Sequence, residues 1–206
     1  MKNKKLFLVP AALLFLVAVI CLVLAVRSYK LANKPYLKCN DHILTKTEYE
    51  YYYNSYKQFY TGSFSQFFSY MGVDETKELE DQEYENGKTF GQMFAEETCE
   101  QIKETYALYD DGIKNGFEFD AGSSFEEYYK TVDESCRASG STSEKYFKQF
   151  YGEGITVKLI REYMTRGFYS AAYYDHLAEN SSDEEAYRYV NDLKAGYKTE
   201  FIDDKE

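Results

Sequence analysis

Few side chains in this chain of 206 residues have the types and spacing that catalysis or metal binding requires. His42 and His176 are its two histidines, and neither has a Cys, Asp or Glu partner at the spacing of a metal site. The run Asp110-Asp111-Gly112 lacks the alternating acidic pattern of a calcium-binding loop. The sequence also contains no glycine-rich phosphate loop and no nucleophile elbow. We therefore expect no catalytic residue, no cofactor and no metal.

Aromatic side chains offer a different chemistry, the binding of apolar polypeptide. The chain has 23 Tyr and 15 Phe but no Trp, and most of these rings are expected on buried helix faces in place of Leu and Ile. In Tyr51-Tyr52-Tyr53, three consecutive helical positions span about 200°, so they cannot all face one core. The candidate peptide-binding residues, which lie on the first predicted long helix around the point where Gly62 can interrupt it, are Tyr51, Tyr52, Phe64, Phe67 and Phe68.

Charge argues against nucleic acid as a partner. The chain has 24 Lys and Arg against 35 Asp and Glu, a formal net charge of −11, whereas phosphate backbones require a basic surface. The first 30 residues hold five basic residues and no acidic one, so the rest carries −16. This charge favours solubility and basic partners.

An uncharged apolar run of 21 residues over 6–26 has the ~20-residue length of a membrane-spanning helix. Three lysines precede the run and three basic residues follow it, so the charge bias is nearly even, and with the terminal amine counted we expect a cytoplasmic N-terminus. A cleaved signal peptide is the alternative, but its apolar stretch would be shorter. Lipidation at Cys21 is a third reading, although the bulky Ile20 before it departs from the lipoprotein pattern. We predict a retained signal-anchor helix.

Three cysteines, Cys39, Cys99 and Cys136, lie beyond this run. An odd number permits one disulfide with one thiol left over, or none. Their spacing matches no zinc motif, and we expect small buried apolar side chains.

Helix-capping patterns organise the rest of the chain. A hairpin is predicted over 36–45, with Asn40-Asp41 at its turn. Residues 73–88 are predicted to form a loop with room for a short helix inside it and a turn at Asn86-Gly87. A long helix is predicted from Val157 to about residue 178. Capping-box spacing, a Ser or Thr three positions before Glu or Gln, predicts five helix starts, at Thr45, Thr89, Ser124, Ser141 and Ser182.

The predicted fold class is all-α, with a transmembrane helix followed by a multi-helix domain that has a small β-hairpin at its start. Residues 1–30 are predicted to contain the cytoplasmic tail and the signal-anchor helix, and 31–35 a linker. The helical domain is predicted over 36–197, and an acidic tail over 198–206.

Four segments together resemble a known family. The segment 39–49 resembles Val-Asn-Gly-x-x-Ile-Thr-x-x-Glu-Phe/Tyr, with Cys39 at the Val and Asp41 at the Gly. The segment 87–90 resembles Gly-Lys-Thr-Trp, and 151–156 and 182–187 resemble later elements. Their order over 36–197 is similar to the N-terminal chaperone region of the SurA and PrsA type of extracytoplasmic foldases.

This resemblance implies a SurA N-terminal or trigger-factor C-terminal-like fold, in which helices form a cradle for unfolded polypeptide. The family normally continues into a parvulin-type prolyl isomerase domain. Only nine residues follow Tyr197, and His42 and His176 both lie within the chaperone-like region. We therefore expect no isomerase domain in this chain.

The sequence thus predicts a chaperone-like protein of the bacterial cell membrane, with its main domain on the extracytoplasmic side. Its expected partners are unfolded or exported polypeptides, bound without ATP, and the membrane. There are two alternatives: a membrane-anchored helical adaptor that docks one specific partner, and a prolyl isomerase relative that has lost its catalytic domain.

Overall fold

Residue 30 and residues 33–202 are described by the computed structural model. The predicted membrane helix over 6–26 and the last four residues of the predicted tail lie outside them. Within the described residues, no helix has both the length and the apolar character needed to cross a bilayer. All strands and α-helices whose bounds follow belong to a compact unit that begins at Pro35.

The predicted hairpin at the start of this unit is confirmed. Strands β1 (Pro35–Cys39) and β2 (His42–Thr45) pair antiparallel. At the turn between them Asn40 adopts a left-handed φ of 49°, a conformation that Asn accepts more readily than most residues. The turn chemistry of the sequence therefore locates the hairpin correctly.

The predicted acidic tail begins with a strand. Residues Thr199–Phe201 form β5, which pairs antiparallel with β1 and makes a three-stranded sheet of order β2-β1-β5. Leu37 of β1 has no exposed surface and lies opposite Phe201. The tail prediction is wrong for these residues because a strand of three residues has too little periodicity to be seen in a charged segment.

Helix α2 spans Lys46–Phe64 and begins as predicted, since the Thr45 side chain accepts a hydrogen bond from the Glu48 backbone N–H at 3.2 Å. The reciprocal bond of a capping box is absent from this helix start, because the Glu48 side chain is used elsewhere in the core. Gly62 does not interrupt the helix. Gly72, with a φ of 75°, follows the turns beyond it.

The segment between α2 and the next long helix contains more structure than the predicted loop. Asn86 and Gly87 form the predicted turn, with φ of 52° and 78°, and it closes a small hairpin that was not predicted. The short elements of this segment are the 3₁₀ turns η1 (Ser65–Phe67) and η2 (Leu79–Asp81) and the strands β3 (Glu83–Glu85) and β4 (Lys88–Thr89).

Five further helices follow. Their bounds are α3 (Phe90–Lys114), α4 (Ala121–Ala138), α5 (Ser143–Tyr151), α6 (Val157–Glu179) and α7 (Asp183–Ala195). The described residues are therefore mostly helical, as predicted.

The predicted helix starts at Thr89 and Ser182 are confirmed by their side-chain caps. Two others are wrong by a few residues. Helix α4 is capped by Asp120, whose carboxylate accepts from the Ser123 N–H at 3.0 Å, so the predicted cap Ser124 lies inside the helix. Helix α5 is capped by Thr142 instead of Ser141. In both cases several capping residues are adjacent in the sequence, and the tertiary position of the helix selects one of them.

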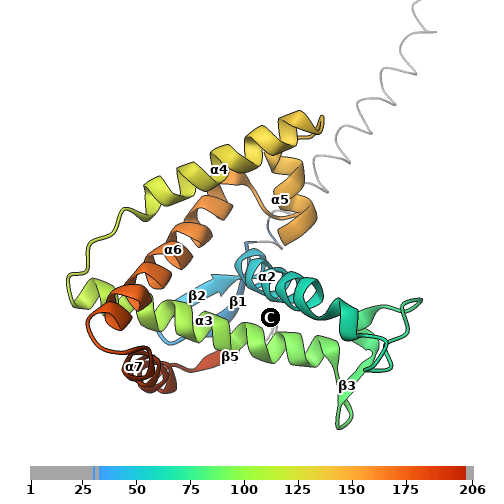
Figure 1. Cartoon of the computed structure of the whole chain (residues 1–206), viewed down its shortest axis with the longest axis horizontal. Helices are drawn as coiled ribbons and strands as arrows, with labels where there is room; N and C mark the ends of the chain where they lie inside the picture. The colour runs from blue at the N-terminus through green and yellow to red at the C-terminus, as the bar shows by residue number, and fades with distance from the viewer. Residues whose placement is uncertain (1–29, 31–32, 203–206) are drawn as a thin grey trace, which may run out of the picture. The chain divides into compact units, whose positions relative to one another are not determined.

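Helix α3 is the central element of the unit. Figure 1 shows it running across the unit, with α2 beside its first half and α6 and α7 against its second half. Gly112 permits the close approach of α6, because a Cβ there would lie 2.9 Å from Cε1 of Tyr169 and 3.1 Å from Cγ of Tyr173. The core is divided into clusters along this helix, and a further cluster lies among α4, α5 and α6.

Candidate functional site

The second half of α2 carries a ladder of aromatic rings that fixes it to α3. The rings of Tyr56 and Tyr60 lie 6.3 Å apart, and those of Tyr60 and Phe64 4.9 Å. Tyr60 is buried and packs edge-on against Phe90 and Phe94 at the start of α3, at 6.1 and 5.5 Å. Offset and edge-to-face rings at these distances attract one another, so this part of α2 is a rigid platform.

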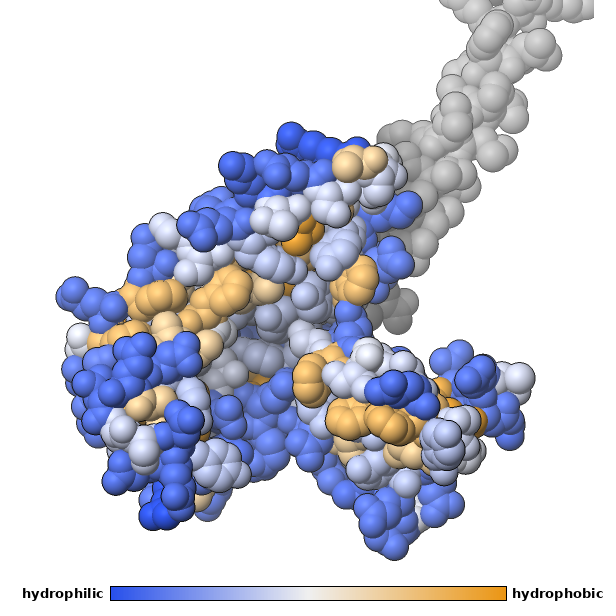
Figure 2. Space-filling model, viewed as in Figure 1, coloured by the Kyte–Doolittle hydropathy of each residue, from blue (hydrophilic) through white to orange (hydrophobic). Residues whose placement is uncertain are grey.

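Large apolar side chains around the end of this platform are exposed. Five large apolar side chains within 13 consecutive residues are at least two-fifths exposed, which we call the aromatic surface: Phe59 (63%), Phe64 (41%), Phe67 (47%), Tyr70 (87%) and Met71 (40%). Single exposed apolar side chains are common, whereas a cluster of this kind marks an interaction site. Figure 2 shows apolar side chains gathered where the end of α2 lies beside the first turns of α3, with the hydrophilic β3 hairpin next to them.

Three of the five sequence-predicted peptide-binding residues lie in this region. Phe64 and Phe67 belong to the aromatic surface. Phe68 is half-buried below it, with its ring 6.3 Å from Tyr60 and 6.1 Å from Phe90. Phe68 therefore supports the surface from beneath.

Tyr51 and Tyr52 do not lie in this region, and we no longer consider them candidate peptide-binding residues. Tyr52 is 6% exposed and packs in the cluster of the sheet and α3, while the Tyr51 ring lies 5.1 Å from Tyr151 and 5.4 Å from Tyr163. One of three consecutive tyrosines must face outward only on a helix that packs against a single core. Helix α2 lies between two clusters instead, so neighbouring positions on different faces are both covered.

Phe59, Tyr70 and Met71 are the exposed residues that the sequence-based selection omitted. The signal that identifies them is the absence of charge, because no Asp, Glu, Lys or Arg occurs in 58–73. A helix end on a protein surface normally carries charged residues on its solvent face. The uncharged stretch 58–73 therefore distinguishes this end of α2 from an ordinary solvated helix end.

The first half of α2 is fixed by a buried ion pair. Glu48 pairs with Arg166 of α6, and the Tyr106 hydroxyl of α3 donates to Oε1 of the same carboxylate at 2.7 Å. The Arg166 guanidinium also lies over the Tyr106 ring, 4.5 Å from its centroid. Burial raises the pKa of Tyr106, which keeps its hydroxyl a neutral donor. Three helices are joined at this point.

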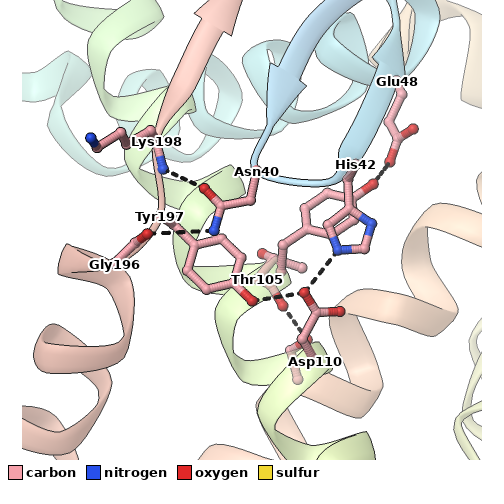
Figure 3. Close-up of polar contacts among 10 residues, drawn as sticks. Asn40, His42, Glu48, Thr105, Asp110, Gly196, Tyr197 and Lys198 are labelled. Carbon is pink, nitrogen blue, oxygen red and sulfur yellow. Dashed lines mark hydrogen bonds and ion pairs between the residues drawn. The ribbon is translucent and has the colours of Figure 1, made fainter.

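A second polar cluster joins the hairpin to α3 and to the segment before β5 (Figure 3). His42 Nε2 lies 2.8 Å from Oδ2 of Asp110, and the Tyr197 hydroxyl donates to the same oxygen at 2.7 Å. The Asn40 side chain accepts from the Lys198 backbone N–H at 2.9 Å.

This second cluster resembles the imidazole and carboxylate of a hydrolase, but its neighbourhood does not support nucleophilic catalysis. Cys39, which lies opposite His42 in the hairpin, could act as a nucleophile by its residue type, but it has no exposed surface. Burial raises the pKa of its thiol to about 11, so it is protonated near neutral pH. In the part of the chain that the structure describes, no three or more His, Cys, Asp and Glu side chains are grouped as a metal site.

Tyrosine hydroxyls have a shared role in these clusters. Besides the bonds to Glu48 and Asp110, both Tyr173 of α6 and Tyr189 of α7 donate to Oδ2 of Asp111 at 2.8 Å. Asp111 is itself buried on α3. Part of the unusual tyrosine content therefore serves to hydrogen-bond carboxylates, of which Glu48 and Asp111 are buried.

Comparisons of the chain with protein-family models, with curated proteins and with solved structures found no match.

Proposed function

We propose that this chain is a chaperone-like protein that binds unfolded or extended segments of exported proteins on the aromatic surface. It would be held at the bacterial cell membrane by residues 6–26, with the helical unit on the extracytoplasmic side. The resemblance of the 36–197 segment to the SurA and PrsA chaperone region supports this proposal, as does the apolar run itself. The binding requires no nucleotide.

The observation that carries the proposal is the exposure of five large apolar side chains between Phe59 and Met71. Fully burying one such side chain is favourable by about 1.5–3 kcal/mol. Part of this free energy is released whenever any apolar segment covers the surface, because the hydrophobic effect has no directional requirement. A surface of this kind therefore accepts many different sequences.

The aromatic surface is held by a rigid platform, which favours binding. The ring ladder of Tyr56, Tyr60 and Phe64 is fixed to α3, and the Val73 N–H donates to the Phe68 carbonyl at 3.0 Å beyond the helix end. A preorganised apolar surface loses less conformational entropy on binding than a flexible one. The bound unfolded polypeptide is the flexible partner and loses most of the conformational entropy.

The experiment uses the full-length chain in lipid nanodiscs, mixed with an unrelated unfolded protein that aggregates. We expect the wild type to suppress light scattering at stoichiometric amounts. The variant Phe59→Gln/Phe67→Gln/Tyr70→Gln should lose most of this suppression, since it removes the three most exposed rings of the aromatic surface. Glutamine is a good helix former, so the change at position 59 is compatible with α2.

The matched control replaces three exposed apolar residues outside the aromatic surface, Ile43→Thr, Ile113→Gln and Tyr187→Gln, which are 61%, 56% and 62% exposed. It should suppress aggregation like the wild type. Equal suppression by both triple variants would refute the proposal.

A further inference from the structure

The aromatic surface ends at a sharp change in charge. Residues 58–73 have no charged side chain, whereas 74–85 have seven acidic residues and a single lysine, Lys77. An uncharged apolar surface and a strongly acidic segment therefore follow each other directly in the sequence.

The fold also keeps the two regions together in space. The cluster around Tyr60 is covered by Leu79 and Tyr84 of the acidic segment and by Val73, the residue just before it. Lys57 of α2 forms an ion pair with Glu80. The acidic segment is thus attached to the same ring ladder that supports the aromatic surface, and it borders that surface.

The lysines of this region are already engaged. Lys77 lies 3.1 Å from Asp74, Lys57 pairs with Glu80, and Lys88 lies 2.6 Å from Glu96 of α3. Five exposed carboxylates of the segment form no ion pair within the described part of the chain. Glu83 accepts a hydrogen bond from the Gly87 backbone N–H at 3.0 Å. The side chains of the other four have no hydrogen-bond partner among the described residues, and we call them the four unpaired carboxylates: Glu75, Glu78, Asp81 and Glu85. These four charges are available to a ligand.

Building on the proposed function, we propose that the site selects polypeptide segments in which apolar side chains are flanked by Lys or Arg. The apolar residues lie on the aromatic surface, and the flanking cations lie beside the four unpaired carboxylates. Segments flanked by Asp or Glu are rejected, because like charges next to the acidic segment repel. Charge complementarity at an exposed rim is screened by salt over a Debye length of about 8 Å at physiological ionic strength.

Three fluorescent peptides with one shared Phe- and Leu-rich core test this selectivity, flanked on both sides by Lys, by Ser or by Glu. The full-length chain is placed in nanodiscs of zwitterionic lipid, and Kd is measured by fluorescence anisotropy against empty nanodiscs. We expect the Lys-flanked peptide to bind about tenfold or more tightly than the Glu-flanked one at low salt, with the Ser-flanked one between them. The difference should shrink severalfold in high salt.

A charge-neutralised variant and its control identify the carboxylates responsible. Replacing the four unpaired carboxylates (E75Q, E78Q, D81N and E85Q) should abolish the preference for Lys flanks and leave Ser-flanked binding within about twofold. The control makes the same change in net charge at four exposed acidic residues elsewhere that form no ion pair in the described chain (E118Q, E134Q, E153Q and E179Q), and it should keep the preference.

The outcomes separate the two proposals. If all three peptides bind equally well, the charge selectivity is overturned while apolar segment binding stands. If the control abolishes the preference as fully as the four-carboxylate variant does, the preference reflects net charge and the assignment to this segment is overturned. If no peptide binds and the aromatic variant suppresses aggregation like the wild type, both proposals are overturned.

Discussion

Glu48 of α2 and Arg166 of α6 form an ion pair in the interior of the helical unit, although 118 positions separate them in the sequence. Their side chains are 8% and 15% exposed. The Tyr106 hydroxyl donates to the same Glu48 oxygen at 2.7 Å. This relationship fixes the base of α2, the helix whose other end carries the aromatic surface.

Replacing Glu48 by Gln should destabilise the fold strongly. The change leaves the Arg166 guanidinium buried without its counter-charge, and breaking a buried pair in this way costs about 3–5 kcal/mol. Urea unfolding followed by far-UV circular dichroism measures the loss. The control is Glu184→Gln, which breaks an ion pair with Arg188 whose side chains are 75% and 68% exposed; it should change the free energy of unfolding by no more than about 1 kcal/mol. Similar losses in both variants would contradict an interior role for the Glu48 pair.

Two glycine-to-alanine substitutions should change stability in opposite directions. In Gly112→Ala the new Cβ would lie 2.9 Å from Tyr169 and 3.1 Å from Tyr173, so rings of α6 must shift, at a cost of about 1–3 kcal/mol. Gly167 lies inside α6, and a Cβ added there would have no neighbouring atom within 4 Å. Alanine at this position should therefore stabilise the helix by about 0.5–1 kcal/mol. Thermal unfolding of both variants measures the difference, and a Gly112→Ala variant as stable as the wild type would show that α3 and α6 do not approach this closely.

Buried tyrosines make the fold sensitive to alkali. Burial raises the pKa of Tyr163 to about 12, and burial together with donation to Asp111 raises that of Tyr173 to about 12. The folded state therefore favours the neutral phenols. Their contribution to stability is fully present below the ordinary pKa of 10.0 and is lost as the pH rises from there through about 12.

A titration that follows tyrosinate absorbance and far-UV circular dichroism together checks this prediction. In the native chain, ionisation of the buried group of tyrosines and loss of helix should occur together above pH 10.0. The urea-unfolded chain should titrate in a single step near pH 10.0. Complete ionisation near that pH with the helices intact would contradict the burial of these hydroxyls.

Local features of the fold were predictable from the sequence because they depend on neighbouring residues. The turn at Asn40, the caps at Thr45, Thr89 and Ser182 and the course of α6 all follow from side chains within four positions. The pairing of β5 with β1 was not predictable in this way. It joins Leu37 to Phe201, and short strands of this kind have no local signal.

The candidate site shows the same limit. Phe64 and Phe67 were predicted from their place on a long aromatic helix, and the structure leaves them exposed. The local sequence supports Tyr51 and Tyr52 equally well. Both are nevertheless covered, because α5 and α6 pack on one side of α2 and the sheet packs on another. The elements that pack around α2 decide which of its rings face water. Their packing cannot be predicted from the helical periodicity of α2 alone.

This difference in burial predicts a separation of stability from binding. Tyr52→Ala removes a core side chain that is 6% exposed and should lower the free energy of unfolding by about 3–5 kcal/mol, as large aromatic deletions do. At a temperature where the variant is still folded, its affinity for an apolar peptide should match the wild type. Phe67→Ala, in a 3₁₀ turn with 47% exposure, should change stability by less than about 1 kcal/mol and weaken peptide binding severalfold. Urea unfolding and fluorescence anisotropy on the same preparations measure both quantities. A loss of binding in folded Tyr52→Ala, with none in Phe67→Ala, would move the binding site from the exposed end of α2 to the core around its beginning.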